Sequence, residues 1–159
     1  MNARQVADII EKAMKSKDLE ALSAVWADDI IFHSPVTAVP FQGKQALAEL
    51  MTPVLGGFET WERTFVMADD ADAVFGARGR IRGRDVELTE LIRLNGDGHV
   101  SEIHITGRPL AGVAAIAAAA APQLAARRGR VRGWIAGVMS GGLPPALASG
   151  DRLITRLAR

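Results

Sequence analysis

The chain has 159 residues, 48% of them apolar, and no cysteine. That length suits one domain with a buried core, and the missing cysteines exclude disulfides, thiolate metal sites and cysteine nucleophiles. The N-terminal sequence MNARQVADIIEKAMKSKDLEAL mixes acids and bases and lacks the continuous apolar run of a signal peptide, so we expect a cytoplasmic protein.

Charge divides the chain into two parts. Residues 1–126 hold 12 Lys and Arg against 17 Asp and Glu (net −5), whereas residues 127–159 hold 7 Arg and one Asp (net +6). We therefore expect a domain over 1–126 and a basic, partly apolar helical extension over 127–159. No nucleic-acid-binding motif or aromatic platform accompanies the arginines, so nucleic acid is not an expected partner.

Three helices and a short strand are predicted in the first third of the chain. Apolar residues recur at helical spacing in two segments, at Val6, Ile9, Ile10, Ala13 and Met14, and at Leu19, Leu22, Val25 and Trp26. Asp18 is placed to cap the second helix. The sequence DDIIFHSP is typical of a strand stopped by Pro35, and GKQALAELMTPVLGGF is typical of a helix between glycines.

From residue 59 onward the apolar pattern changes to a period of two. It predicts strands over 59–67, 73–82, 85–94 and 99–108, separated by ADDAD, GR and NGDG. Helices followed by a strand meander indicate an α+β fold. On the first of these strands Trp61, Phe65 and Met67 share one face, which is a candidate lining for a cavity.

Glu90 stands out in the segment VELTELIRL. Alternation places it on the same strand face as Val86, Leu88, Ile92 and Leu94, as the one carboxylate in an apolar row. A type II′ turn at Gly83 and Arg84 would pair Arg82 with Asp85 and Arg80 with Glu87 on the outer face. The same register sets small or apolar residues opposite the inner row, with Gly79 opposite Leu88, Ala77 opposite Glu90, and Phe75 opposite Ile92.

The length of the NGDG loop sets the pairing of the last predicted strand, 99–108, with strand 85–94. If the loop has four residues, Ile103 lies beside Glu90, Ile105 lies beside Leu88, and His104 points outward opposite Thr89. A bulge or a different loop length would exchange the two faces and bring His104 inward.

The order of elements resembles the nuclear transport factor 2-like superfamily, especially its SnoaL-like branch. The resemblance rests on four segments that span roughly residues 5–120, in this order: WADDIIFHSP, FQGKQALAELM, VELTELIRLNGDGHVSEI and RPLAGVAAI. It implies a cone-shaped fold, in which a strongly bent, mainly antiparallel sheet wraps around the N-terminal helices and leaves a mostly apolar pocket. It also implies a homodimer formed through the sheet face.

The resemblance extends to single residues of the site. Glu90 matches an acidic pocket position of relatives similar to ketosteroid isomerases and limonene-epoxide hydrolases. Ser34 stands where the isomerases carry their general-base aspartate. The arginine and the second acid of the epoxide hydrolases fall on Leu88 and near Ile105. Neither full catalytic set is therefore present.

Two functions remain open at this point. Burial in an apolar pocket would raise the pKa of Glu90, so that it could exchange protons near neutral pH in a cyclase, isomerase or hydrolase reaction without a cofactor. Alternatively, Glu90 anchors a ligand in a binding or interaction module without turnover. Both hypotheses predict a small, largely apolar ligand.

Further candidates surround Glu90. His33 and His104 would be its catalytic partners if they faced the pocket, although alternation places His33 away from Phe32 and Ser34. Three histidines this far apart in sequence define no metal site. The expected pocket-lining residues are Phe32, Ser34, Trp61, Phe65, Phe75, Ala77, Leu88, Ile103 and Ile105.

The C-terminal part is predicted from composition alone. The sequence PLAGVAAIAAAAAPQLAA is typical of an Ala-rich helix interrupted by Pro122, and GWIAGVMSGGLPPALAS is broken by glycines and prolines. Neither is a convincing membrane span. We expect the extension to pack within the molecule or a dimer rather than on a membrane surface.

Overall fold

The computed structural model describes residues 1–126, 145, 147 and 149. Its elements in chain order are α1 (Ala3–Ser16), α2 (Leu19–Ala24), β1 (Trp26–His33), β2 (Phe41–Gln42), α3 (Lys44–Gly57), β3 (Phe58–Ala68), β4 (Asp72–Ile81), β5 (Arg84–Leu94), β6 (Val100–Arg108) and α4 (Leu110–Ala126). The predicted basic extension falls almost entirely outside the described residues. Within them, no helix combines the length and the apolar character needed to cross a bilayer.

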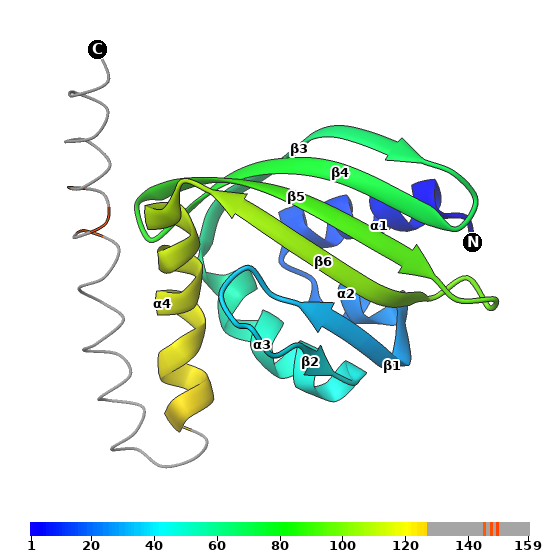
Figure 1. Ribbon diagram of the computed structural model, residues 1–159, viewed down its shortest axis with the longest axis horizontal. Helices are drawn as coiled ribbons and strands as arrows, with labels where there is room; N and C mark the ends of the chain where they lie inside the picture. The colour runs from blue at the N-terminus through cyan, green and yellow to red at the C-terminus, as the bar shows by residue number, and fades with distance from the viewer. Residues whose placement is uncertain (127–144, 146, 148, 150–159) are drawn as a thin grey trace.

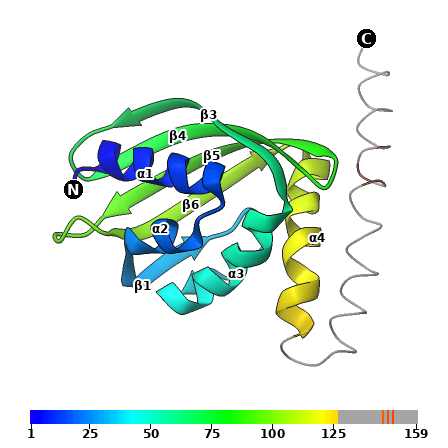
Figure 2. The same ribbon diagram turned by 180° about the vertical axis from the view of Figure 1, so that it is seen from behind.

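One curved six-stranded sheet organises the fold. Its strand order is β2-β1-β6-β5-β4-β3, and every neighbouring pair is antiparallel except β1 with β6. Helices α1, α2 and α3 cover the concave face, and α4 closes one end of the sheet (Figures 1 and 2). The predicted α+β cone is confirmed.

The helix starts follow from local capping. Asn2 and Gln5 form a reciprocal capping box at the start of α1, and the Asp18 side chain accepts a hydrogen bond from the backbone N–H of Ala21, as predicted for the second helix. That helix ends at Ala24, before Trp26, which instead begins β1. The last helix is not interrupted at Pro122 as expected, because α4 runs on to Ala126.

The hairpin between β4 and β5 is registered differently from the prediction. Its two turn residues are Arg82 and Gly83, both at positive φ (49° and 72°), which defines a type I′ turn rather than a type II′ turn beginning at Gly83. The register therefore shifts by two residues, so that Phe75 lies opposite Glu90 and Ala77 lies opposite Leu88. A shift of two leaves every side chain on its predicted face.

The outer charge pairs change with that shift. Neither Arg82–Asp85 nor Arg80–Glu87 is formed. Arg80 lies opposite Asp85 and donates to its Oδ1 at 2.7 Å, and Glu87 lies opposite Arg78.

The β5–β6 hairpin is also two residues away from the predicted register. Gly98 has a φ of 77° and donates to the Asn95 carbonyl, so the chain turns within three residues, 96–98, rather than four. The turn accounts for one residue of the shift, and an irregularity next to Leu94 adds the second. Glu90 therefore lies opposite Ile105, and His104 lies opposite Leu91 while still pointing outward.

A bulge in β3 overturns the predicted face of that strand. The pairing with β4 slips between Arg63 and Phe65, so Thr64 is the extra residue. Trp61 stays buried, whereas Phe65 and Met67 point outward and are 44% and 64% exposed. Strict alternation from Trp61 onward was therefore wrong, because one extra residue exchanges the faces of everything that follows it.

Candidate active site

An apolar cavity of about 170 Å³ lies between the concave face of the sheet and the helices. Strands β1, β5 and β6 form its floor, helices α1, α2, α3 and α4 form its walls, and the loop after β1 borders it. It is lined by Ile10, Met14, Leu22, Trp26, Phe32, Ser34, Pro35, Val36, Thr37, Phe41, Leu47, Leu50, Met51, Val54, Phe58, Leu88, Glu90, Ile103, Ile105, Ile116, Ala117, Ala120 and Ala121. Most of these side chains are aliphatic or aromatic, so the cavity suits an apolar molecule.

Glu90 supplies the carboxyl group of this cavity. Its side chain faces the helices from the middle of β5, between Leu88 and Ile92 along the strand and between Phe75 and Ile105 across the sheet. It is 7% exposed and has no hydrogen-bond or ion-pair partner among the described residues. Burial raises its pKa from the ordinary 4.5 to about 7.

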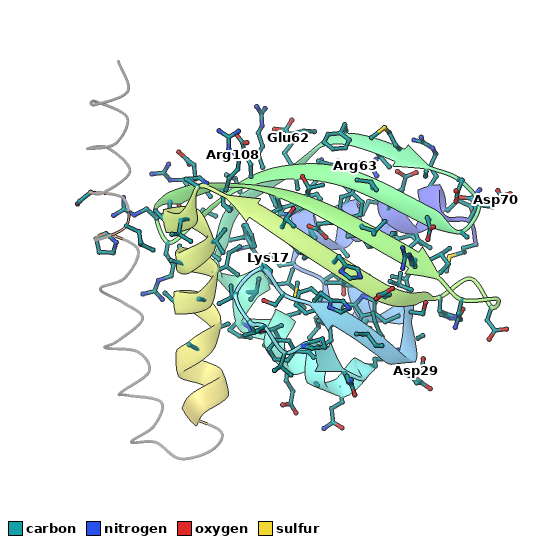
Figure 3. The ribbon with its side chains drawn as sticks, viewed as in Figure 1. Lys17, Asp29, Glu62, Arg63, Asp70 and Arg108 are labelled. Atoms are coloured by element: carbon teal, nitrogen blue, oxygen red, sulfur yellow. The ribbon has the colours of Figure 1, made fainter. Side chains whose placement is uncertain are left out.

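The concave face offers Glu90 no compensating cation within the described part of the chain. Arg63 of β3 also points toward the helices, but its guanidinium contacts Asp8 at 2.7 Å and Glu11 at 2.8 Å, both on α1. Figure 3 shows that Arg63 lies on the strand far from β1 and β6. The carboxyl group of Glu90 therefore stays unpaired, and it can take up or release a proton near neutral pH.

The expected pocket-lining residues separate into three groups. Phe32, Ser34, Leu88, Ile103 and Ile105 line the cavity together with Glu90. Trp61, Phe75 and Ala77 are buried but lie in the core outside the cavity lining. Phe65 is on the opposite face of the sheet because of the bulge, so its placement in the pocket was wrong.

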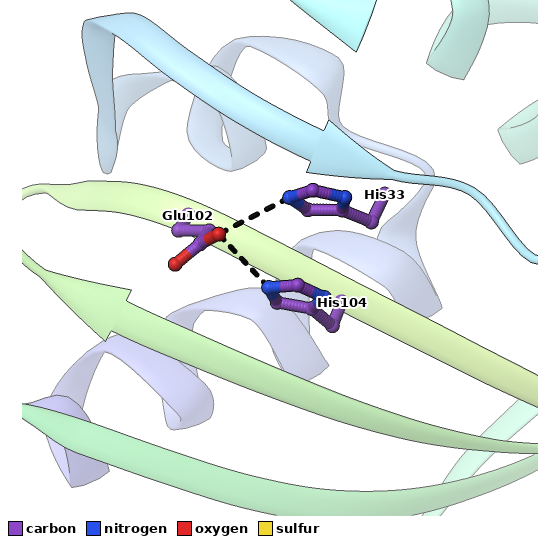
Figure 4. Close-up of side chains that lie close together, drawn as sticks. All are labelled: His33, Glu102 and His104. Carbon is purple, nitrogen blue, oxygen red and sulfur yellow. Dashed lines mark hydrogen bonds and ion pairs between the residues drawn. The ribbon is translucent and has the colours of Figure 1, made fainter. Parts of the chain in front are cut away.

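His33 and His104 lie outside the cavity, on the outer face of the sheet. They are direct neighbours across the parallel pair of β1 and β6, and their rings stack with centroids 3.9 Å apart. Both rings reach Oε1 of Glu102, His33 Nε2 at 3.1 Å and His104 Nε2 at 2.9 Å (Figure 4). The hydrogen bond from His104 is the main cause that lowers the pKa of Glu102. Neither histidine can therefore act on a ligand beside Glu90.

The two hydroxyl side chains at the cavity are occupied locally. Ser34 Oγ accepts a hydrogen bond from the backbone N–H of Val36, and the Thr37 hydroxyl donates to the Val39 carbonyl. Both bonds hold the loop between β1 and β2 in place. Glu90 is thus the group best placed for proton exchange.

Sequence reasoning missed much of the cavity wall. Trp26 was expected at the end of the second helix and not in the pocket, yet it lines the cavity, and its indole Nε1 is buried without a hydrogen-bond partner among the described residues. Ile116, Ala117, Ala120 and Ala121 of α4 also line it. An Ala-rich helix has almost no amphipathic pattern, so no signal in the sequence shows which of its sides faces the cavity.

Comparison with known proteins places this geometry in a family. The SnoaL-like domain family matches residues 6–134, so the chain belongs to that family. A search of curated proteins gave no match.

Solved structures share the fold. A steroid delta-isomerase from Pseudomonas aeruginosa is 23% identical with a TM-score of 0.71, over 80% of this chain and 94% of that one. An uncharacterised protein with a cystatin-like fold from Silicibacter pomeroyi is 19% identical with a TM-score of 0.71, over 83% and 92%. A proposed polyketide cyclase from Sinorhizobium meliloti is 22% identical with a TM-score of 0.55, over 64% and 94%. At these identities the comparisons establish the fold.

Proposed function

We propose that the protein binds a small, largely apolar molecule in the cavity and that Glu90 exchanges a proton with it, without a cofactor. The observation that carries this proposal is a buried, unpaired carboxyl group whose pKa of about 7 suits both proton uptake and proton release at neutral pH. A buried carboxyl group with a purely structural role needs a hydrogen-bond or ion-pair partner to offset the free-energy cost of its burial, and Glu90 has none among the described residues.

The size of the cavity limits the ligand. An apolar cavity of roughly 150 Å³ holds a benzene molecule, and this cavity measures about 170 Å³. The proposed ligand is therefore one ring with short substituents, such as a cyclic ketone, a lactone or a monocyclic terpenoid epoxide. Its carbonyl or epoxide oxygen, or the carbon next to the carbonyl, lies beside Glu90.

Two reaction types fit a single carboxyl group. As the carboxylate, Glu90 removes a proton from the carbon next to a carbonyl and returns it elsewhere, which is an isomerisation or the first step of an aldol-type cyclisation. As the neutral acid, it protonates an epoxide oxygen while a water molecule attacks a ring carbon and the C–O bond breaks, and the proton that the water loses restores the acid. The fold neighbours named as an isomerase and a proposed cyclase support the first type by analogy of fold.

A binding function without turnover is the second candidate, and one observation favours it. By resemblance, the further catalytic groups of related isomerases and epoxide hydrolases fall on Ser34, on Leu88 and near Ile105, and Ser34 already bonds within its own loop. Glu90 would then donate or accept one hydrogen bond that orients the ligand.

The test screens cyclic ketones, lactones and monocyclic epoxides, each beside its hydrocarbon analogue, for thermal stabilisation of the protein. Stabilising ketones are then followed by NMR for exchange of the α-hydrogen with deuterium, and stabilising epoxides for ring opening. We expect Glu90→Gln to lower turnover at least about 100-fold while ligands still bind.

Glu87→Gln is the matched control, because Glu87 lies on the same strand but on the exposed outer face, and it should leave turnover unchanged. Binding by both proteins without any exchange would support the binding module. Turnover that survives in Glu90→Gln would disprove the catalytic role.

A further inference from the structure

A second cluster of chemically active side chains lies on the outer face of the sheet. Glu102 and His104 project from the same face of β6, two residues apart, and His33 of β1 is paired directly with His104. The three donor atoms, two Nε2 and one Oε1, lie within 4.8 Å of one another. Two hydrogen-bonded strands hold them together, so their spacing is set by the sheet rather than by a loop.

Two imidazoles and one carboxylate are a donor set for a divalent transition metal. Zinc bonds of 2.0–2.2 Å to nitrogen and oxygen place neighbouring ligand atoms roughly 3.3 Å apart around a tetrahedral ion. The Nε2 atoms of His33 and His104 are 3.1 Å and 2.9 Å from Glu102 Oε1, close to that spacing. Two of the three separations between ligand atoms are thus close to those around a bound ion.

The groups around the cluster orient the carboxylate. Arg93 of β5 lies opposite Glu102 and donates to its Oε2 at 3.1 Å, which leaves Oε1 turned toward the two histidines. The positive charge of Arg93 opposes a cation, but Asp72 lies 3.7 Å from the same guanidinium and offsets part of it. Contacts of this kind, made to the ligands of a metal rather than to the metal itself, fix ligand orientation in metal sites.

The cluster is open to an ion from solvent, and its histidine rings can rotate. The histidine side chains are 37% and 40% exposed, so an ion can enter from solvent and keep a water ligand. The rings are almost parallel, with 5° between their planes and centroids 3.9 Å apart, so one ion cannot lie in both ring planes, and at least one imidazole must turn out of the stack to bind it. Their exposed edges leave room for that rotation.

We propose that His33, His104 and Glu102 bind a divalent transition-metal ion, with zinc as the fitting choice for this donor set. The site is separate from the proposed active site: Phe32 and Ile103, the chain neighbours of His33 and of His104 and Glu102, line the cavity on the other face of the sheet. The ion links β1 to β6 across the parallel pair of the sheet, and binding therefore raises the melting temperature of the folded protein.

The test is calorimetric titration of the chelator-treated full chain with Zn²⁺, together with Co²⁺ as a spectroscopic probe. We expect about one Zn²⁺ per chain with micromolar or tighter affinity, and visible Co²⁺ absorption bands of low-symmetry coordination. His33→Ala and His104→Ala should each weaken binding at least about tenfold and abolish the zinc-induced rise in melting temperature.

His99→Ala is the matched control, because His99 is the third histidine of the chain and lies outside the cluster. It should bind zinc as the original protein does, and so should Glu90→Gln, whose cavity is on the opposite face. The melting temperature of each zinc-free variant shows that it is folded, and His33→Gln or His104→Gln replaces the alanine variant at the same position if that variant does not fold. Absence of stoichiometric binding, or equal binding by folded His33 and His104 variants, would overturn the proposal.

Discussion

At the scale of single residues, the proposed chemical role of Glu90 comes with a cost in stability. Its pKa is about 7 in the folded protein and near 4.5 in an unfolded chain. The folded protein therefore holds the proton more tightly than the unfolded chain does. The stability associated with the protonated group is fully present below pH 4.5, is lost as the pH rises from 4.5 to about 7, and stays lost above that range.

This difference gives a prediction for Glu90→Gln. One pKa unit corresponds to about 1.4 kcal/mol, so the free energy of unfolding should fall by about 3 kcal/mol between pH 4.5 and 8 in the original protein relative to the variant. Other titrating groups are common to both proteins and cancel. Urea unfolding at a series of pH values measures the difference.

The control for this experiment is again Glu87→Gln. Glu87 is exposed and contacts Arg108 at 3.5 Å, so its replacement should leave the pH profile nearly parallel to that of the original protein. Equal slopes for the original protein and Glu90→Gln between pH 4.5 and 7 would mean that Glu90 is not held in an apolar environment.

The two candidate sites differ in how far sequence can predict them. Glu90 could be found because one carboxylate in an alternating apolar row is a local pattern. The cluster of His33, Glu102 and His104 could not, because 71 positions separate the histidines and only the parallel pairing of β1 with β6 brings them together. The outward direction of both histidines followed from alternation, but their contact did not.

At the scale of elements, the turns decide the register. The pattern of the strands predicted which residues face the helices on β5 and β6, because a shift of two residues preserves faces. It did not predict the pairing partners, since two turn types fit the same RGR sequence around Gly83. The alternation of apolar residues did not predict the bulge at Thr64, which turns Phe65 and Met67 to the outer face of the sheet.

The type I′ turn gives a prediction at Gly83. Its φ of 72° is unfavourable for any residue with a Cβ, although a Cβ there would meet open space. Gly83→Ala should therefore destabilise the protein by about 1 kcal/mol through backbone strain alone. Urea unfolding at one pH measures this effect.

Gly56→Ala is the control that separates backbone strain at Gly83 from the effect of adding a methyl group at any glycine. Gly56 lies within α3, has no positive φ and would also place its Cβ in open space, so the substitution should stabilise the helix by up to about 1 kcal/mol. Effects of the same sign at both positions would contradict the assigned turn.

At the scale of the whole molecule, the outer face of the sheet carries an apolar stripe. Met67, Val74 and Leu91 lie side by side on β3, β4 and β5 and form this stripe, and the row ends at His104 and His33, which belong to the proposed metal site and not to the stripe. Charged side chains lie on the same outer face, among them Glu62 and Arg108, which point away from the core (Figure 3). Several of these charges are paired within the sheet, as Arg78 is with Glu62 at 2.8 Å.

An apolar stripe on the same face as paired charges supports the homodimer that the family resemblance implies. A partner could cover the stripe without breaking ion pairs, because those pairs close within one chain. We therefore predict a dimer held mainly by apolar contacts through this face. Its dissociation constant should change little with salt.

Analytical ultracentrifugation of Met67→Glu tests that assembly. Met67 is 64% exposed, so a carboxylate is tolerated in the monomer but would be buried unpaired in the dimer, and the dissociation constant should rise at least about tenfold. Val39→Glu is the matched control, because Val39 is an exposed valine in the loop between β1 and β2, away from the stripe. A monomer at every concentration, or a dimer that Met67→Glu leaves intact, would show that this face is not the interface, and the stripe would then be an ordinary solvent-facing surface of the sheet.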